Sequence, residues 1–254
     1  MSDQNPEAPT PAEQPTSRAV LLRTVKPTAT YVLMAVMVVF YLAQVLTERF
    51  TGTDLLFLYM GKIQQFILAG QLWRFITPAF LHGSVLHIAS NLYALYVLGI
   101  QLEGVYNHRR FLLLFFVAAF GGNVLSFVLS PASSLGASTA IFGLLGADIV
   151  FVLQNRRYLG GRSRGLLTNL VVVLMLNLII GFNPALNIDY FGHLGGLIAG
   201  SLFAYLAGPK WQLQWSEFQP ELKDSRSLRE IRNAGLIVFL GFCLIAAIPF
   251  IFHG

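Results

Sequence analysis

Charged residues are scarce in this chain of 254 residues. Asp, Glu, Lys and Arg together make up 11% of the sequence, whereas an ordinary soluble domain carries about 25%. The mean hydropathy is +0.64. This shortage of charge excludes an ordinary soluble protein and indicates an integral membrane protein built from apolar helices.

Cysteine is almost absent as well. Cys243 is the only cysteine, so no intrachain disulfide can form and no redox motif is present. Its position in an apolar run predicts a small packing residue. No polar stretch is long enough for a separate soluble domain, so we expect one membrane domain with tails.

The apolar residues are arranged in seven runs that approach the length of about 20 residues needed to cross a bilayer. These runs are 28–46, 85–102, 111–130, 138–154, 167–182, 190–207 and 234–252. The segment 50–81 is too interrupted by polar residues to span and predicts an amphipathic stretch at the membrane interface. The fold class we expect is an all-α membrane protein with seven spans.

Basic residues are distributed unevenly between the loops. One side of the membrane receives Arg18, Arg23, Lys26, Arg109, Arg110, Arg156, Arg157, Arg162, Arg164, Lys210, Lys223, Arg226, Arg229 and Arg232, and the other only Arg49, Lys62 and Arg74. Cytoplasmic loops retain Lys and Arg, so we expect a cytoplasmic amino terminus and an external carboxyl terminus. The basic loops are explained as topology determinants and do not indicate nucleic-acid binding.

These patterns divide the chain into four parts. Residues 1–27 are rich in Pro, Glu, Gln and Thr and predict a disordered cytoplasmic tail. A six-helix core at 28–208, a cytoplasmic linker at 209–233 and a seventh helix at 234–254 follow. We expect a multi-pass protein of the cell membrane.

The predicted orientation brings polar residues of three parallel runs to one depth. Ser138 begins one run, and His193 lies in the first turn of another. The third run or its lead-in carries His82, His87 and Asn91. All five side chains are therefore expected near the outer face of the membrane.

A serine hydroxyl becomes a good nucleophile when an adjacent base takes its proton, and imidazole suits that task near neutral pH. A serine at a helix start is ordinarily an N-cap, but an ionisable group such as His193 inside a membrane is costly and usually functional. Gly192, Gly196 and Gly200 recur every four residues. Such a stripe lets helix backbones approach closely, which would bring Ser138 and His193 together.

Acyl transfer also needs donors for a developing oxyanion. His87 and Asn91 are four residues apart and share one helix face, and the backbone N–H of Ser138 is free at its helix start. His82 lies off that face, so we expect it to make a structural hydrogen bond.

These motifs together resemble the rhomboid intramembrane serine proteases. The resemblance is carried by Gly-Ala-Ser at 136–138, by Gly-His-Leu-Gly-Gly at 192–196 and by His-Gly-Ser-Val-Leu-His-Ile-Ala-Ser-Asn at 82–91. Trp-Arg at 73–74 and Leu-Gly-Ile-Gln-Leu-Glu at 98–103 add to it. It covers about 70–208, which is nearly the whole six-helix core.

The resemblance implies a rhomboid-type bundle with a Ser138–His193 catalytic dyad. It implies an oxyanion hole formed by His87, Asn91 and the Ser138 amide, with no metal and no cofactor. The supporting residues are Gly136, His82, Phe142 and Gly196. The implied substrates are single-span membrane proteins, cut near the outer end of a transmembrane segment.

Two positions depart from the family pattern. Thr139 stands where the family usually has Gly, and its branched side chain could constrain the turn or narrow the oxyanion site. Phe142 stands where Tyr is frequent, which keeps the ring and loses the hydroxyl.

Other functions were weighed against this hypothesis. Asp148 lies about 15 Å deeper than Ser138, and Asp189 is expected in the external loop, so we favour a dyad over a triad. The unequal depth of the aspartates excludes an aspartyl protease, and the lack of a His-Glu-x-x-His motif excludes a typical zinc protease. Two alternatives remain. One is a rhomboid-like protein that binds clients without cutting them, which the presence of Thr139 supports, and the other is a transporter.

Overall fold

The computed structural model describes residues 25–183, 188–215 and 220–253, so the predicted tail lies almost entirely outside the described residues. Seven helices within this described part are long and apolar enough to cross a membrane, as the hydropathy pattern predicted. They are α1 (Thr28–Thr51), α4 (Val85–Tyr106), α5 (His108–Leu129), α6 (Ser138–Leu159), α7 (Arg162–Gly181), α8 (Tyr190–Ala207) and α9 (Leu228–His253). The last helix begins at Leu228, earlier than the apolar run at 234 indicated.

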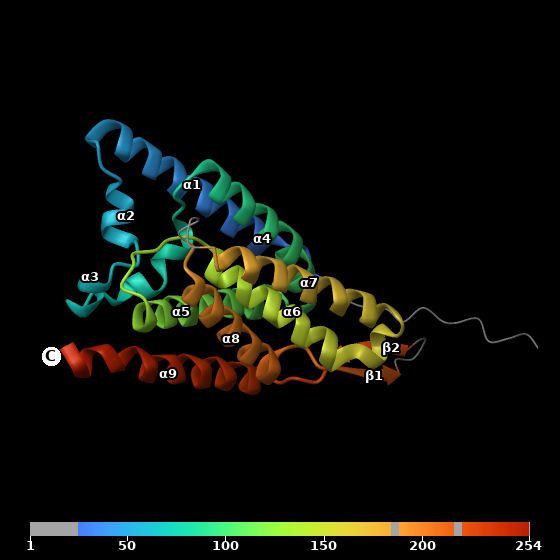
Figure 1. Cartoon of the computed structure of the whole chain (residues 1–254). Helices are drawn as coiled ribbons and strands as arrows, with labels where there is room; N and C mark the ends of the chain where they lie inside the picture. Colours follow the sequence, from blue (N-terminus) through green and yellow to red (C-terminus); the bar gives the residue numbers. More distant parts are fainter. Residues whose placement is uncertain (1–24, 184–187, 216–219, 254) are drawn as a thin grey trace, which may run out of the picture.

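Successive long helices run in alternate directions through the bundle (Figure 1). The starts of α4, α6 and α8 therefore lie at one end, which we call the Ser138 end. The opposite end carries Arg109, Arg110, Arg156, Arg157, Lys210 and Arg232, and we call it the basic end. Which end faces the cytoplasm stays a prediction from the basic residues.

The segment between α1 and α4 forms four short helices instead of a span. They are α2 (Leu55–Met60), α3 (Gln64–Leu68), η1 (Leu72–Phe75) and η2 (Thr77–Phe80). Arg74 of η1 ties this helix to α2, because its guanidinium donates to the carbonyl oxygens of Gly61 and Leu58, both at 2.7 Å. Arg74 is fully buried and is thus a structural cross-link, whereas the exposed Trp73 suits a membrane interface.

The centre of the bundle is formed by α5, α6 and α8. Helices α6 and α8 meet backbone to backbone, as the glycine stripe predicted: a Cβ placed on Gly196 would lie 1.9 Å from the carbonyl oxygen of Thr139. One turn along, a Cβ on Gly200 would lie 2.3 Å from the carbonyl oxygen of Gly143. Only glycine fits at these two positions.

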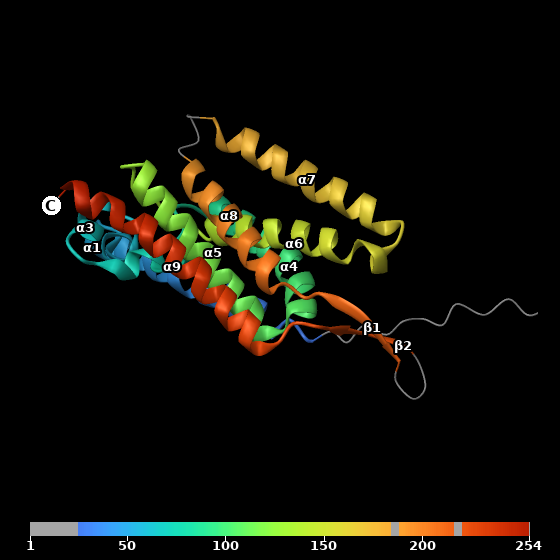
Figure 2. The ribbon, with the colours of Figure 1, turned by 90° about the horizontal axis from the view of Figure 1, so that it is seen from below.

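Helix α7 is packed least. Only 6% of its most apolar window is buried, compared with 72% for α6. Its main neighbour is α6, and Figure 2 shows it on the opposite side of the bundle from α9. Most of its surface is therefore available to lipid.

Glu103, near the end of α4, caps the start of α1. Its carboxylate accepts from the backbone N–H groups of Ala29 at 2.8 Å and Thr30 at 2.7 Å, and it contacts His108 Nδ1 at 2.5 Å. Glu103 is therefore taken up by α1 and His108, and it forms no ion pair with Arg109 or Arg110 in the described part of the chain. The reason is that the first N–H groups of a helix need an acceptor when no water reaches them.

The linker between α8 and α9 contains a short hairpin that the sequence analysis did not predict. Strands β1 (Trp211–Trp215) and β2 (Pro220–Asp224) pair in antiparallel register. The hairpin is tied to the bundle by Asn155, whose Oδ1 accepts from the Trp211 backbone N–H at 2.8 Å, and by an ion pair of 2.7 Å between Arg110 and Asp224. Helix α9 then returns along α5.

We expect Gly196→Ala to weaken the bundle, because the added methyl overlaps a backbone carbonyl that cannot move alone. Overpacking of this kind costs about 1–3 kcal/mol of unfolding free energy. Thermal unfolding in detergent measures the effect. Gly241→Ala is the matched control, because nothing lies within 4 Å of that position in α9. Equal melting temperatures for both variants would contradict the close contact.

Candidate active site

Ser138 and His193 are brought together by the contact between α6 and α8. Ser138 is the first residue of α6, and the His193 ring stacks on Phe142 with 4.2 Å between centroids and 15° between planes. Residues four apart share a helix face, so Phe142 lies one turn below Ser138 on that face. The imidazole is therefore held against the first turn of α6, which begins with Ser138, and Phe142 supplies the ring that packs on it.

The two side chains are not yet hydrogen-bonded. Within the described residues, neither the Ser138 hydroxyl nor the His193 imidazole forms a hydrogen bond. His193 Nδ1 lies 3.8 Å from the point where a Cβ of Gly181, at the end of α7, would stand. Catalytic hydrogen bonds are often long without substrate and tighten when it binds.

His87 lies close to Gly136, two residues before Ser138. A Cβ on Gly136 would stand 2.7 Å from His87 Nε2 and 3.6 Å from Ser138 Oγ. Gly136 also has a φ of 129°, which L side chains rarely adopt. Gly136 is thus required for its conformation and for the space it leaves to His87.

Asn91 follows His87 by one turn of α4. It is 7% exposed, and its Nδ2 is buried without a hydrogen-bond partner among the described residues. An unpaired buried amide donor costs on the order of 1–3 kcal/mol. An unpaired donor that lowers stability indicates that Asn91 has a role other than stabilising the fold.

His82 packs against His87 with ring centroids 5.1 Å apart and an interplanar angle of 75°. Burial, together with the neighbouring His87, lowers the pKa of His82 from 6.5 to about 3, so the ring is neutral at physiological pH. Both ring nitrogens are buried and form no hydrogen bond within the described chain. The expected structural hydrogen bond is made instead by its backbone N–H, which donates to Gln44 Oε1 at 2.9 Å.

The loop before Ser138 is held by Lys62, which in the sequence alone is recognisable only as an external basic residue. Lys62 Nζ donates to the carbonyl oxygens of Ser130, at 3.2 Å, and Ala132. Its backbone pairs with Ser134 through bonds of 2.9 and 3.0 Å. Burial lowers the pKa of Lys62, while the charge of Asp189 acts in the opposite direction. Lys62 therefore fixes the path of the chain into α6.

The two aspartates weighed as third members of a triad have other partners. Asp189 caps α8 by accepting from the Gly192 backbone N–H at 2.9 Å, and it accepts from Ser126 Oγ at 2.5 Å. Asp148 accepts from Gln101 Nε2 at 3.0 Å. Neither carboxylate hydrogen-bonds to His193 in the described part of the chain.

Comparison with known protein families supplies the deciding observation. The family described as the rhomboid domain matches residues 69–210, which is more than half of the chain. The chain belongs to the rhomboid family. The matched region of this rhomboid runs from just before η1 to just beyond α8 and includes Ser138, His193, His87 and Asn91. It leaves out α1, α2, α3 and α9.

Several rhomboids from distant organisms are similar in sequence. The rhomboid protease GluP of Bacillus subtilis is 38% identical over 196 residues, which is 77% of this chain and 38% of that protein. RHOMBOID-like protein 1 of Arabidopsis thaliana is 38% identical over 144 residues, which is 56% of this chain and 36% of that protein. Rhomboid-like protease 3 of Toxoplasma gondii is 36% identical over 148 residues, which is 56% of each chain. The chain thus matches about half or less of each relative's length.

Thr139, where this rhomboid departs from the family pattern, is directed into the helix interface. Its Cγ2 lies 3.0 Å from the points where Cβ atoms of Gly122, on α5, and Gly192, on α8, would stand. These two glycines make room for the extra side chain. Its Oγ1 is buried without a partner among the described residues, so the side chain fills space between three helices.

We expect Thr139→Gly to lower the melting temperature and not to raise turnover, because it removes packing and leaves the Ser138 face unchanged. Loss of a few buried heavy atoms costs on the order of 1–3 kcal/mol. Thr139→Val is the matched control, since it keeps the shape and removes only the unpaired hydroxyl; its stability should equal or exceed that of the wild type. A faster Thr139→Gly enzyme with unchanged stability would show instead that the side chain obstructs the site.

Proposed function

We propose that this chain is an intramembrane serine endopeptidase of the rhomboid type. The observation that carries the proposal is the meeting of Ser138, His193, His87 and Asn91 at the starts of α4, α6 and α8. A nucleophile, a base and hydrogen-bond donors in one place are what acyl transfer requires. Packing alone explains the glycines of this region, but it gives no reason for a histidine beside a serine in a membrane bundle.

In the proposed reaction Ser138 Oγ attacks the carbonyl carbon of the scissile peptide bond, while the His193 imidazole takes the hydroxyl proton. The tetrahedral intermediate then breaks its C–N bond, and the imidazolium returns the proton to the leaving amine. A water molecule, deprotonated by His193, hydrolyses the acyl-enzyme and restores Ser138. The reaction uses side chains and water, and it calls for no cofactor.

The donors for the oxyanion are assigned to the Ser138 amide, His87 and Asn91. The Gly83 backbone N–H donates to His87 Nδ1 at 3.4 Å. A neutral imidazole has one donor and one acceptor nitrogen, so this contact leaves the proton on Nε2, the atom that lies beside Gly136. The assignment also explains why Asn91 Nδ2 is unpaired, because its acceptor, the oxyanion, forms only during the reaction.

The proposed substrates are transmembrane segments of other membrane proteins, cut near the membrane face at the Ser138 end. The distribution of basic residues supports an external location for that face, and we assign the enzyme to the cell membrane. A segment arriving from the bilayer must pass between helices. Helix α7 is the least packed of them, and its end, at Gly181, lies beside His193, so we assign the substrate's path to this side.

One alternative function is that of a rhomboid that binds clients without cutting them. Thr139 was the feature that kept it open, and that side chain points into the interface of α5, α6 and α8. No feature of the site now favours the non-cleaving function or a transporter. The presence of both Ser138 and His193 favours catalysis.

We expect the purified protein to react with a serine-directed phosphonate and to cleave a model transmembrane substrate, and both activities to disappear in Ser138→Ala. His193→Ala should lose them too, because the hydroxyl then has no base. Ser133→Ala is the matched control, since Ser133 is an exposed serine of the same loop. Labelling or cleavage that survives in Ser138→Ala would refute the assigned nucleophile, and an inert wild type would favour client binding.

Asn91→Ala should lower kcat on the order of 10²-fold, which is typical for the loss of one oxyanion donor. KM should change little, because the donor acts on a charge that appears only in the transition state. Steady-state cleavage of the model substrate separates the two constants. Asn233→Ala is the control, because this exposed asparagine lies near the start of α9, at the basic end of the bundle. Equal kcat for Asn91→Ala and Asn233→Ala would remove Asn91 from the site.

A further inference from the structure

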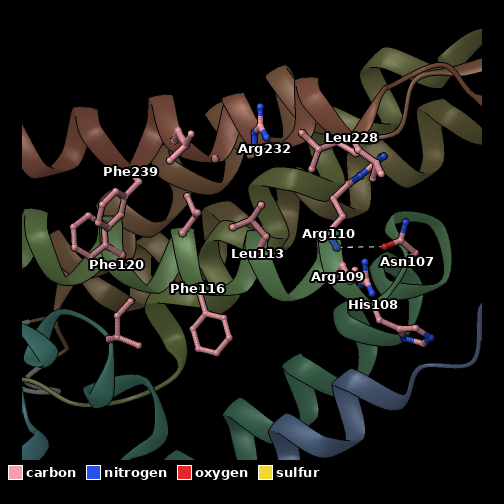
Figure 3. Close-up of a pocket in the computed structure, with 15 residues that line it drawn as sticks. Asn107, His108, Arg109, Arg110, Leu113, Phe116, Phe120, Leu228, Arg232 and Phe239 are labelled. Atoms are coloured by element: carbon pink, nitrogen blue, oxygen red, sulfur yellow. Dashed lines mark hydrogen bonds between the residues drawn. The ribbon is translucent and has the colours of Figure 1, made fainter.

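A groove of about 720 Å³ runs between α5 and α9 and ends at the basic end of the bundle. Leu113, Phe120 and Phe239 line its apolar part, where the centroids of the two phenylalanine rings lie 4.7 Å apart. Arg109 and Arg232 border its polar end. Figure 3 shows these side chains along the two facing helices. The groove is thus apolar within the spans and cationic where the spans end.

Arg110 brings buried donors to the polar end of the groove. It is 5% exposed and extends from α5 toward Leu228 at the start of α9 (Figure 3). Its Nη2 pairs with Asp224, but its Nε and Nη1 are buried without a partner among the described residues. Arginine stays charged in proteins, and a buried charged donor that is unpaired is costly. These donors point to an anionic acceptor.

The carboxylates of this corner already have partners. Asp224 pairs with Arg110, Glu230 pairs with Arg226 and Ser227, and Glu103 is taken up by α1 and His108. Arg109 and Arg232 are exposed and form no ion pair with any described residue. The polar end of the groove therefore keeps an excess of positive charge.

We propose that this groove binds one anionic phospholipid. Its phosphate group lies among Arg109, Arg232 and the free donors of Arg110, and an acyl chain lies along Leu113, Phe120 and Phe239. Basic pockets between transmembrane helices bind anionic head groups in this manner. The groove volume of about 720 Å³ lies within the range of about 300–1,000 Å³ that ligand sites have. The bound lipid fastens α9 and the hairpin to α5.

The test uses the full-length protein in phosphatidylcholine nanodiscs, with and without a minority of phosphatidylglycerol. Stabilisation of the protein by lipid is measured by thermal unfolding, with the reaction of Cys243 in α9 with a thiol-reactive dye as the readout. Native mass spectrometry measures retained lipid. The variant is Arg109→Gln with Arg232→Gln. The control is Arg162→Gln with Arg164→Gln, which removes the same charge from exposed residues of α7 at the same end.

We expect phosphatidylglycerol to raise the unfolding temperature of the wild type and of the control, and to be retained by both as a single bound lipid. The groove variant should lose most of that rise and the retained lipid. Equal loss in the control would show a diffuse charge effect and overturn the site. Equal protection by phosphatidylcholine alone, or no protection at all, would overturn it as well. None of these readouts depends on proteolysis.

Discussion

The backbone contact between α6 and α8 determines the rest of the structure. Helices in lipid gain little from the hydrophobic effect and associate through close packing, and Gly196 and Gly200 allow the closest packing available. Two helices at backbone distance cannot slide or rotate against each other without a clash. The contact therefore sets the depth and direction of His193 relative to Ser138, and Phe142 completes the fit by stacking on the imidazole.

A second set of contacts fixes the irregular chain at the Ser138 end. Lys62 and Arg74 are fully buried, and both direct their donors to backbone carbonyl oxygens. Burying charges costs free energy that such contacts only partly return. What they provide is a defined path for the loop that carries Gly136 into α6. The backbone bond from Gly136 to the Pro78 carbonyl, at 2.9 Å, belongs to the same framework.

The spans could be predicted from sequence, because a bilayer imposes helix length. Ser138 and His193 could be selected as candidate residues because they lie in recognisable motifs. The rotation of each helix could not. Thr139 follows the serine directly, yet its side chain leaves the site and enters the interface with Gly122, which only the packing of three helices decides. The hairpin was missed because its strands are short and its anchor, Asn155, lies far away in sequence.

The cap that Glu103 places on α1 has a consequence for the order of assembly. The two backbone N–H groups that donate hydrogen bonds to Glu103 lie 74 and 73 residues earlier in the chain. In any order of insertion, these two N–H groups have no carboxylate partner until α4 has been synthesised as far as Glu103 and has packed against α1. The start of α1 must therefore stay hydrated at the membrane surface during biogenesis, and α1 takes its final place only after α4 has been made.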